Sequence, residues 1–83
     1  MPENKIEETL TDVFREVFDD PALTLKRTMT AADVREWDSF NHVRLIVSAE
    51  ERFGISLPTS EVADLRNVGE LIDLIGKHLA RKK

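Results

Sequence analysis

The sequence has no cysteine, and its two histidines, His42 and His78, are far apart in the chain. Without cysteine, neither a disulfide framework nor a thiolate metal site can form. Without a His-x-x-x-His pair a zinc site is not expected either, so we predict no metal site. No apolar run approaches the roughly 20 residues that span a bilayer, and residues 1–5 lack the hydrophobic region of a signal peptide. These absences predict a cytoplasmic protein with no stable membrane association.

Catalytic motifs are missing as well. The chain has no glycine-rich phosphate cradle and no Gly-x-Ser-x-Gly elbow, and residues 19–38 lack the acidic spacing of a calcium-binding loop. Ser39 and His42 are three residues apart and would be neighbours on a helix. A hydrolase triad also requires an oxyanion hole and a substrate cleft, for which a chain of 83 residues offers little room. We therefore expect no enzymatic activity.

The net charge of −4 conceals an uneven distribution. Residues 77–83 contain four lysines or arginines and no acid, which leaves eight basic and 16 acidic side chains in residues 1–76. An acidic body repels the phosphates of nucleic acids and favours protein partners with basic patches. The basic tail, residues 77–83, is interpreted as a solvated helix end that complements the helix dipole. Contact with a membrane or with RNA is the alternative for this tail.

Apolar residues at helical spacing predict two long helices in the first two thirds of the chain. The first covers about residues 6–18 and ends ahead of Pro21, because proline cannot continue the hydrogen-bond ladder of a helix. The second covers about residues 39–53 and ends before Gly54, since glycine is a common helix stop.

Two further helices are predicted after Gly54. A brief helix covers residues 59–65, with Thr59 or Ser60 as its cap, and its few apolar side chains make it the most mobile element. A last helix covers about residues 68–79, with Asn67 as its cap and an acidic residue three positions later that completes a capping box. No segment predicts a strand.

The predicted fold is all-α, a small four-helix bundle of three longer helices and one short helix. A single domain over residues 1–83 is expected, with its core at about residues 5–80 and one long loop, residues 19–38, between the first two helices. A loop of this length should be pinned to the core or functional. The apolar side chains that we expect to pin it are Leu23, Leu25, Met29 and Val34.

Three features close to the second helix carry separate expectations. Residues 30–33 resemble a capping box that opens a single helical turn. Trp37 is expected to pack on the loop or against a neighbouring helix end, with direct ligand contact as the alternative. His42 is expected to fill the top of the core or the mouth of a cavity between helices.

The second helix has apolar residues on two faces. One stripe should face the core and consists of Leu45, Ile46, Ala49 and Phe53. A second apolar patch is rimmed by charged residues, which is typical of a protein-docking face. Phe40 favours docking because it follows Ser39 directly, whereas Val43 fits either docking or a second buried side. The patch and its neighbours are Phe40, Val43, Arg44, Val47, Ser48 and Glu51.

Either Asp38 or Ser39 can cap this helix, because a side-chain oxygen there accepts from free N–H groups of the first turn. The stretch Asp38-Ser39-Phe40, with Val43, Leu45, Ile46, Val47 and then residues 50–55, resembles the acyl carrier protein family. In that family the serine of an Asp-Ser-Leu motif bears a 4′-phosphopantetheine arm that comes from coenzyme A. The resemblance covers nearly the whole chain and implies attachment at Ser39, with Asp38 assisting the transferase.

The resemblance also implies partners and further site residues. The partners are a phosphopantetheinyl transferase, an acyl-loading ligase or acyltransferase and other pathway enzymes, and the protein is expected to be a monomer. Much of the partner-docking surface would consist of Phe40, Val43, Arg44, Val47 and Glu51. The acyl chain could enter between the helices, against Leu45, Ile46, Ala49, Val62 and Leu71.

The sequence departs from the family pattern at several positions. Phe40 replaces the usual leucine, Arg35-Glu36-Trp37 replaces a glycine-containing approach, and residues 39–49 contain no acid where the family's exposed helix face is acidic. Basic partner patches should therefore bind this helix more weakly, or the helix serves different partners. These differences favour a specialised carrier of lipid, polysaccharide or secondary-metabolite pathways. An aminoacyl or peptidyl carrier and an unmodified helical interaction module are the alternatives.

Overall fold

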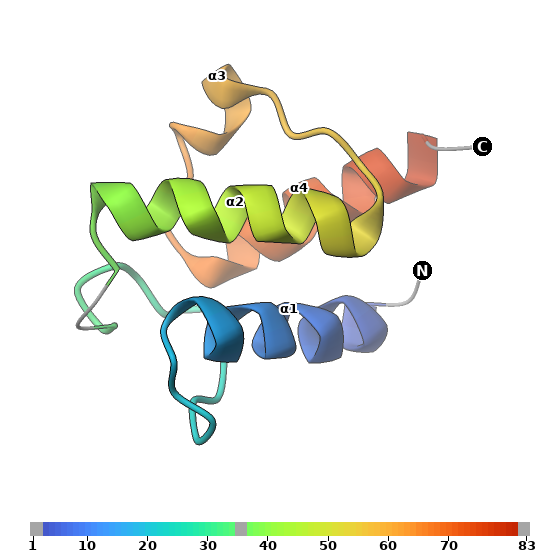
Figure 1. Ribbon diagram of the computed structural model, residues 1–83. Helices are drawn as coiled ribbons and strands as arrows, with labels where there is room; N and C mark the ends of the chain where they lie inside the picture. Colours follow the sequence, from blue (N-terminus) through green and yellow to red (C-terminus); the bar gives the residue numbers. More distant parts are fainter. Residues whose placement is uncertain (1–2, 35–36, 82–83) are drawn as a thin grey trace.

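The computed structural model describes residues 3–34 and 37–81, and within them it is entirely helical apart from loops and turns. The four helices are α1 (Glu3–Val17), α2 (Ser39–Phe53), α3 (Thr59–Val62) and α4 (Val68–Arg81) (Figure 1). The predicted all-α fold, with three longer helices, one short helix and a long loop before α2, is confirmed. Two of the segments discussed above lie outside the described residues. They are residues 82–83, at the end of the basic tail, and residues 35–36, where the sequence departs from the family pattern.

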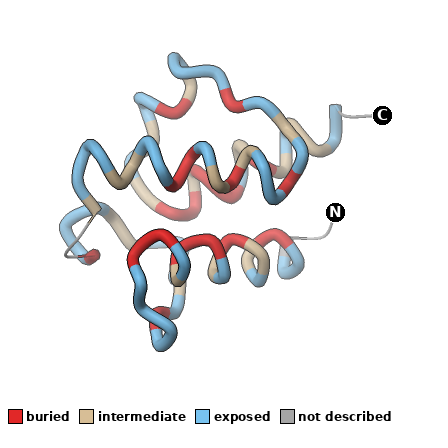
Figure 2. Tube along the Cα trace, in the orientation of Figure 1, coloured by how far each residue is buried: buried red, intermediate tan, exposed pale blue. Residues whose placement is uncertain are grey.

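The core lies between the three longer helices. The helix α1 packs against both α2 and α4, and the tube in Figure 2 shows their buried positions turned toward one another. Every residue of the described chain that is buried is hydrophobic or glycine, with no buried polar or charged side chain. The largest fully buried side chains are Phe14, Leu10, Leu45, Leu71, Ile72, Ile75, Val13 and Val68.

Local sequence fixes both ends of α2. At the start, Asp38 is the N-cap, because its Oδ1 accepts from the Asn41 N–H at 2.9 Å and its carbonyl accepts from the His42 N–H at 2.8 Å. At the end, Gly54 adopts φ 66°, a left-handed conformation that side chains disfavour. This turn directs the N–H groups of Gly54 and Ile55 to the carbonyl of Glu50. The cap is therefore Asp38 rather than Ser39.

The cause of one expected helix end and the boundary of another helix need correction. The helix α1 is closed by Asp19, which has φ 51°, with the Asp20 N–H bonded to the Arg15 carbonyl at 3.0 Å. A left-handed residue therefore ends α1 before Pro21 is reached. The helix α3 ends at Val62 instead of residue 65, and its N-cap is Pro58, which makes no side-chain cap bond, so the predicted caps Thr59 and Ser60 are wrong.

The long loop is pinned to the protein, as predicted, and partly by the expected side chains. Leu23 and Val34 are buried, while Leu25 and Met29 pack against the core half-buried. Residues 30–33 form a turn in which Asp33 Oδ2 accepts from the Thr30 N–H at 2.9 Å. This turn does not continue into a helix.

Backbone hydrogen bonds also fix the loop to the start of α4. The carbonyls of Met29 and Arg27 accept from the N–H groups of Val68 and Gly69, each at 2.8 Å. These N–H groups belong to the first turn of α4 and have no partner within that helix. A Cβ on Gly69 would lie 3.0 Å from the Arg27 carbonyl oxygen, a tighter contact than most side chains make, so the close approach favours glycine. The Arg27 guanidinium adds an ion pair to Asp73 at 2.9 Å.

Candidate functional site

Ser39 is the first residue of α2 and its side chain is exposed. Because Asp38 provides the cap, the Ser39 hydroxyl makes no hydrogen bond to any residue that the structure describes. The free N–H groups and the positive end of the helix dipole lie beside it. The Ser39 hydroxyl is therefore accessible, and it lies at a position that favours the binding of a phosphate group.

The outer face of α2 is apolar and exposed next to Ser39. The exposed fractions of Phe40, Val43 and Val47 are 71%, 61% and 48%. This decides the open question on Val43, which is not buried between helices. The Arg44 guanidinium lies 6.0 Å from the centre of the Phe40 ring, within the range of a cation–π contact. Exposed large apolar side chains in a row, with Arg44 and exposed Glu51 beside them, are typical of a protein-binding face.

The inner face of α2 is closed. Leu45 and Ala49 are completely buried, and Ile46 and Phe53 nearly so. The five residues predicted to contact an acyl chain are all buried members of the hydrophobic core: Leu45, Ile46, Ala49, Val62 and Leu71.

An open groove of about 410 Å³ starts at Ser39 and runs between the end of the loop, α2 and the α3 region. Its walls include Val62 but not Leu45, Ile46 or Ala49, and they consist of Ala31, Trp37, Asp38, Ser39, His42, Val62, Ala63 and Leu65. A smaller, more enclosed cavity of about 80 Å³ shares Ala31, Trp37, His42 and Leu65 with the groove and reaches Leu71.

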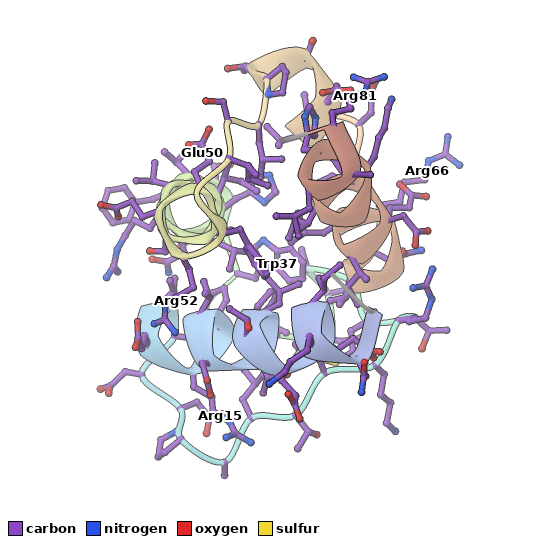
Figure 3. The ribbon with its side chains drawn as sticks, turned by 90° about the vertical axis from the view of Figure 1, so that its right-hand side faces the viewer. Arg15, Trp37, Glu50, Arg52, Arg66 and Arg81 are labelled. Atoms are coloured by element: carbon purple, nitrogen blue, oxygen red, sulfur yellow. The ribbon has the colours of Figure 1, made fainter. Side chains whose placement is uncertain are left out.

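Trp37 and His42 join this groove to the core. The Trp37 side chain, labelled in Figure 3, extends toward α1. Its ring packs edge-on against Phe14, in the last turn of α1, with ring centres 5.3 Å apart, which confirms the predicted packing against a helix end. Its Nε1–H donates to His42 Nδ1 at 3.0 Å. His42 is half-buried and lines the groove, so it lies at a cavity mouth, one of the two places expected for it.

Side-chain contacts attach α3 to α4. Nε2 of His78 lies 2.9 Å from Glu61 Oε2, and Lys77 Nζ lies 3.7 Å from Glu61 Oε1. The hydrogen bond from His78 is the main cause that holds the pKa of the Glu61 carboxyl below its ordinary value. Partial burial raises this pKa and so opposes the effect, whereas the charges of His78, Lys77 and Arg81 lower the pKa further. Sequence reasoning missed this pair, because residues 17 positions apart on two helices show no periodic signal.

Residues 3–34 and 37–81, which the structure describes, contain no group of three or more potential metal ligands. None of their helices has the length and apolar character that a membrane crossing requires.

Comparison with known proteins gives consistent matches over most of the chain. A family model described as the phosphopantetheine attachment site matches residues 8–75. An acyl carrier protein of Acidothermus cellulolyticus is 33% identical over 66 residues, which cover 80% of this chain and 79% of that protein. One from Thermosynechococcus vestitus is 33% identical over 61 residues, 74% of each chain. The solution NMR structure of a holo acyl carrier protein from Geobacter metallireducens aligns with a TM-score of 0.84 at 46% identity, over 89% of this chain and 85% of that chain.

The helical fold, the accessible serine and these matches together define a domain to which phosphopantetheine is covalently attached. The chain belongs to the acyl carrier protein family. Carriers of this family are not enzymes themselves, and pathway enzymes act on the group that they bear.

Proposed function

We propose that Ser39 is the attachment residue and that the protein presents acyl groups, bound as thioesters to the arm, to enzymes of a specialised pathway. One observation carries the assignment: the Ser39 hydroxyl is exposed at the N-terminus of α2, and it does not cap this helix because Asp38 does. In the attachment reaction, the Ser39 Oγ forms a bond to phosphorus of coenzyme A. The bond to the adenosine bisphosphate leaving group breaks, and the hydroxyl proton passes to a base of the transferase.

The residues around Ser39 fit the phosphodiester that would result. The first-turn N–H groups of α2 and the helix dipole favour a negative group at this position. One oxygen of Asp38 accepts from the Asn41 N–H, and the side chain is exposed. Its other oxygen is therefore available to a magnesium ion held by the transferase, which is the assisting role that we propose for Asp38.

We propose the outer face of α2 as the surface that partner enzymes contact. Its members are Phe40, Val43, Arg44, Val47 and Glu51, all of them exposed. An apolar row next to the attachment residue lets a partner bury hydrophobic area while it holds the arm. The first 11 residues of α2 contain no acid, so the partner surface opposite Arg44 should be neutral or acidic. This charge pattern supports a specialised carrier rather than one recognised through an acidic helix.

An acyl chain that enters the interior would pass Val62 first, which lines the groove at Ser39, and then Leu71, which lines the smaller cavity that shares four residues with this groove. Leu45, Ile46 and Ala49 lie behind them in the closed core. Contact with those three side chains requires that α2 and α3 separate. We propose that the carrier works as a monomer in the cytoplasm, together with a transferase, an acyl-loading ligase or acyltransferase and other enzymes of its pathway.

The attachment is tested by intact mass after incubation with coenzyme A, magnesium and a broad-specificity phosphopantetheinyl transferase. Wild type should gain the mass of one phosphopantetheine, and Ser39→Ala should gain none. Ser48→Ala is the matched control, because it removes a serine hydroxyl from the same helix, and it should be modified fully. Phe40→Ala keeps the hydroxyl but removes an exposed docking side chain, so it should reach the same final mass more slowly.

Either of two results would overturn the assignment. Wild-type protein that gains no mass, while the transferase modifies a known carrier in the same tube, would indicate an unmodified interaction module. A mass gain that persists in Ser39→Ala would place the arm elsewhere. Loading of the modified protein by an adenylating ligase with an amino acid, and not with a fatty acid, would identify an aminoacyl or peptidyl carrier.

A further inference from the structure

Two charged side chains on the outer face of α2 have no ion-pair partner in the part of the chain that the structure describes. The Arg44 guanidinium contacts uncharged groups, because it lies over the Phe40 ring and its Nη1 donates to Asn41 Oδ1 at 3.2 Å. The exposed Glu51 carboxylate makes no hydrogen bond or ion pair with a described residue. Both charges are therefore available to a second molecule.

The charges on either side of Glu51 in the sequence are engaged within the chain. Glu50 Oε2 accepts from the Leu57 N–H at 2.7 Å. Arg52 Nη2 lies 2.8 Å from Glu16 Oε1 and forms an ion pair with it. The charge that the end of α2 offers to another molecule is therefore the negative charge of Glu51.

The charge along the outer face changes sign from one end of α2 to the other. Residues spaced by four, three and four positions form one stripe on this helix, and they are Phe40, Arg44, Val47 and Glu51. Arg44 and Glu51 are about 10 Å apart along the helix axis, so they are not neighbours on one helix. The stripe thus has a free positive charge, an exposed apolar residue in the middle and a free negative charge.

We propose that the outer face of α2 binds the same face of a second copy of this chain, with the two α2 helices antiparallel across a two-fold axis beside Val47. The midpoint between Arg44 and Glu51 lies beside Val47, so each Arg44 faces Glu51 of the other copy. One axis therefore satisfies both charges twice and packs the two Val47 side chains together, as in an isologous contact. Antiparallel helices also bring opposite ends of the helix dipoles together.

The shape of the face fits the same arrangement. The axis places the start of one α2 against the end of the other. The Phe40 side chain is 71% exposed at the start, and Gly54, which has no side chain, is exposed at the end. The ring therefore has room over the Gly54 turn of the other copy. Figure 3 looks along α2 and shows no other element over its outer side.

The contact is small, so the association is weak. The helix α2 has 15 residues and is about 22 Å long, and two such faces bury less than the roughly 800 Å² per partner of a stable complex. We expect a dissociation constant of about 0.1–1 mM. At lower concentration the monomer proposed above predominates. Since the contact uses the side chains proposed above for partner enzymes, a second copy competes with those enzymes for the face.

The test measures molar mass by sedimentation equilibrium, with unmodified full-length protein from micromolar to millimolar concentration. Wild type should change from monomer toward dimer over this range. Arg44→Glu places acids opposite each other at both charge pairs, and Glu51→Arg places arginines opposite each other, so each variant should associate about tenfold more weakly. Both substituted residues are exposed, so the fold should be retained.

Lys26→Glu is the matched control for Arg44→Glu. It makes the same change in net charge at an exposed residue of the long loop, away from α2, and should associate as wild type does. If it weakens association as much as Arg44→Glu, net charge explains the effect and the pairing is overturned.

An equimolar mixture of Arg44→Glu and Glu51→Arg tests the antiparallel arrangement itself. In a mixed pair the acid introduced at position 44 faces the arginine introduced at position 51, and the native Glu51 faces the native Arg44. The mixture should therefore form dimers at concentrations where neither variant does so alone.

Three results would overturn the proposal. They are a wild type that stays monomeric at millimolar concentration, an Arg44→Glu variant that associates as wild type does, and a mixture that stays monomeric. The protein in this test carries no arm, so the result is independent of the attachment proposed at Ser39. Failure of the attachment would appear in the intact mass, and failure of the pairing would appear in the sedimentation.

Discussion

Two irregular segments flank the groove at Ser39, and they are held in place by different means. One is the end of the long loop, which contributes Ala31 and Trp37, and the other is the α3 region, which contributes Val62, Ala63 and Leu65. The loop is the longer of the two, yet it is attached to α4 through backbone hydrogen bonds and a close approach at Gly69. The α3 region is attached mainly through side chains, at Glu50 and Glu61.

This difference shows that length alone does not decide how firmly an irregular segment is fixed. Backbone bonds to the start of α4 tie the loop to a helix of the core, whereas α3 has four residues and one buried side chain. Local opening is easiest where few apolar contacts are buried. We therefore expect the groove to open on the α3 side, while the loop side and the Trp37–His42 pair stay in place.

The largest effect is expected from Gly69→Ala, which breaks the attachment of the loop. The added Cβ would meet the Arg27 carbonyl at 3.0 Å, and a backbone atom cannot move aside as a flexible side chain can. We expect a loss of about 2–3 kcal/mol in the free energy of unfolding, in the upper part of the range for overpacking. Chemical denaturation measures this loss.

Gly76→Ala is the matched control on the same helix. A Cβ there meets only Ile6 Cδ1, at an ordinary contact distance of 3.5 Å. Alanine is a better helix former, so this variant should gain up to about 1 kcal/mol. Equal effects of the two alanines would show that the loop is not held by the close approach at Gly69.

A smaller effect is expected from Glu50→Ala, on the α3 side. Glu50 Oε2 accepts from the Leu57 N–H at 2.7 Å and thereby fixes the chain that leads into α3. Without this acceptor a poorly exposed N–H loses its partner, which should lower the free energy of unfolding by about 1–2 kcal/mol. Glu51→Ala removes the neighbouring exposed carboxylate and should stay within about 0.5 kcal/mol of wild type. If Glu51→Ala destabilises as much, the loss reflects charge and not the bond to Leu57.

The smallest effect is expected from Glu61→Gln and depends on pH. Since the pKa of Glu61 in the folded protein is lowered below 4.5, its contribution is present above about that pH and is lost as the pH falls through the lowered value. The variant should therefore be slightly less stable than wild type at pH 7, and the difference should disappear as the pH falls through the lowered pKa of Glu61. Amide exchange at Val62 and Ala63 should be faster at pH 7 in the variant. Asp64→Asn, which neutralises an exposed acid nearby, should leave that exchange unchanged.

The parts of the fold that depend on the periodic spacing of apolar residues were predictable from the sequence. The apolar stripes gave the three longer helices, and the two apolar faces of α2 are respectively buried and exposed as predicted. Single contacts between distant segments were not predictable. In the sequence, Gly69 is only a residue that weakens a helix, and the Arg27 carbonyl beside it is known only from the structure. Likewise, Glu61 and His78 are in contact only because the fold brings α3 next to α4.

The site was predictable to a similar extent. The position of Ser39 at a helix start follows from the local sequence, because capping depends on adjacent residues. The groove beside it does not, since its walls come from three segments that the chain brings together. Val62 was expected near an acyl group and does line the groove at Ser39, whereas Leu71 lines only the smaller cavity next to it. Leu65, which lines both spaces, was not assigned to the site, and ligand contact by Trp37 was only the alternative to packing.

The chain contains one tryptophan and no tyrosine. Its near-ultraviolet emission therefore originates at Trp37, a residue in van der Waals contact with the core on one side and adjacent to the attachment groove on the other. Since Trp37 and Ser39 line the same groove, modification of Ser39 should change this emission. Attachment could then be followed in real time by intrinsic fluorescence, without a label.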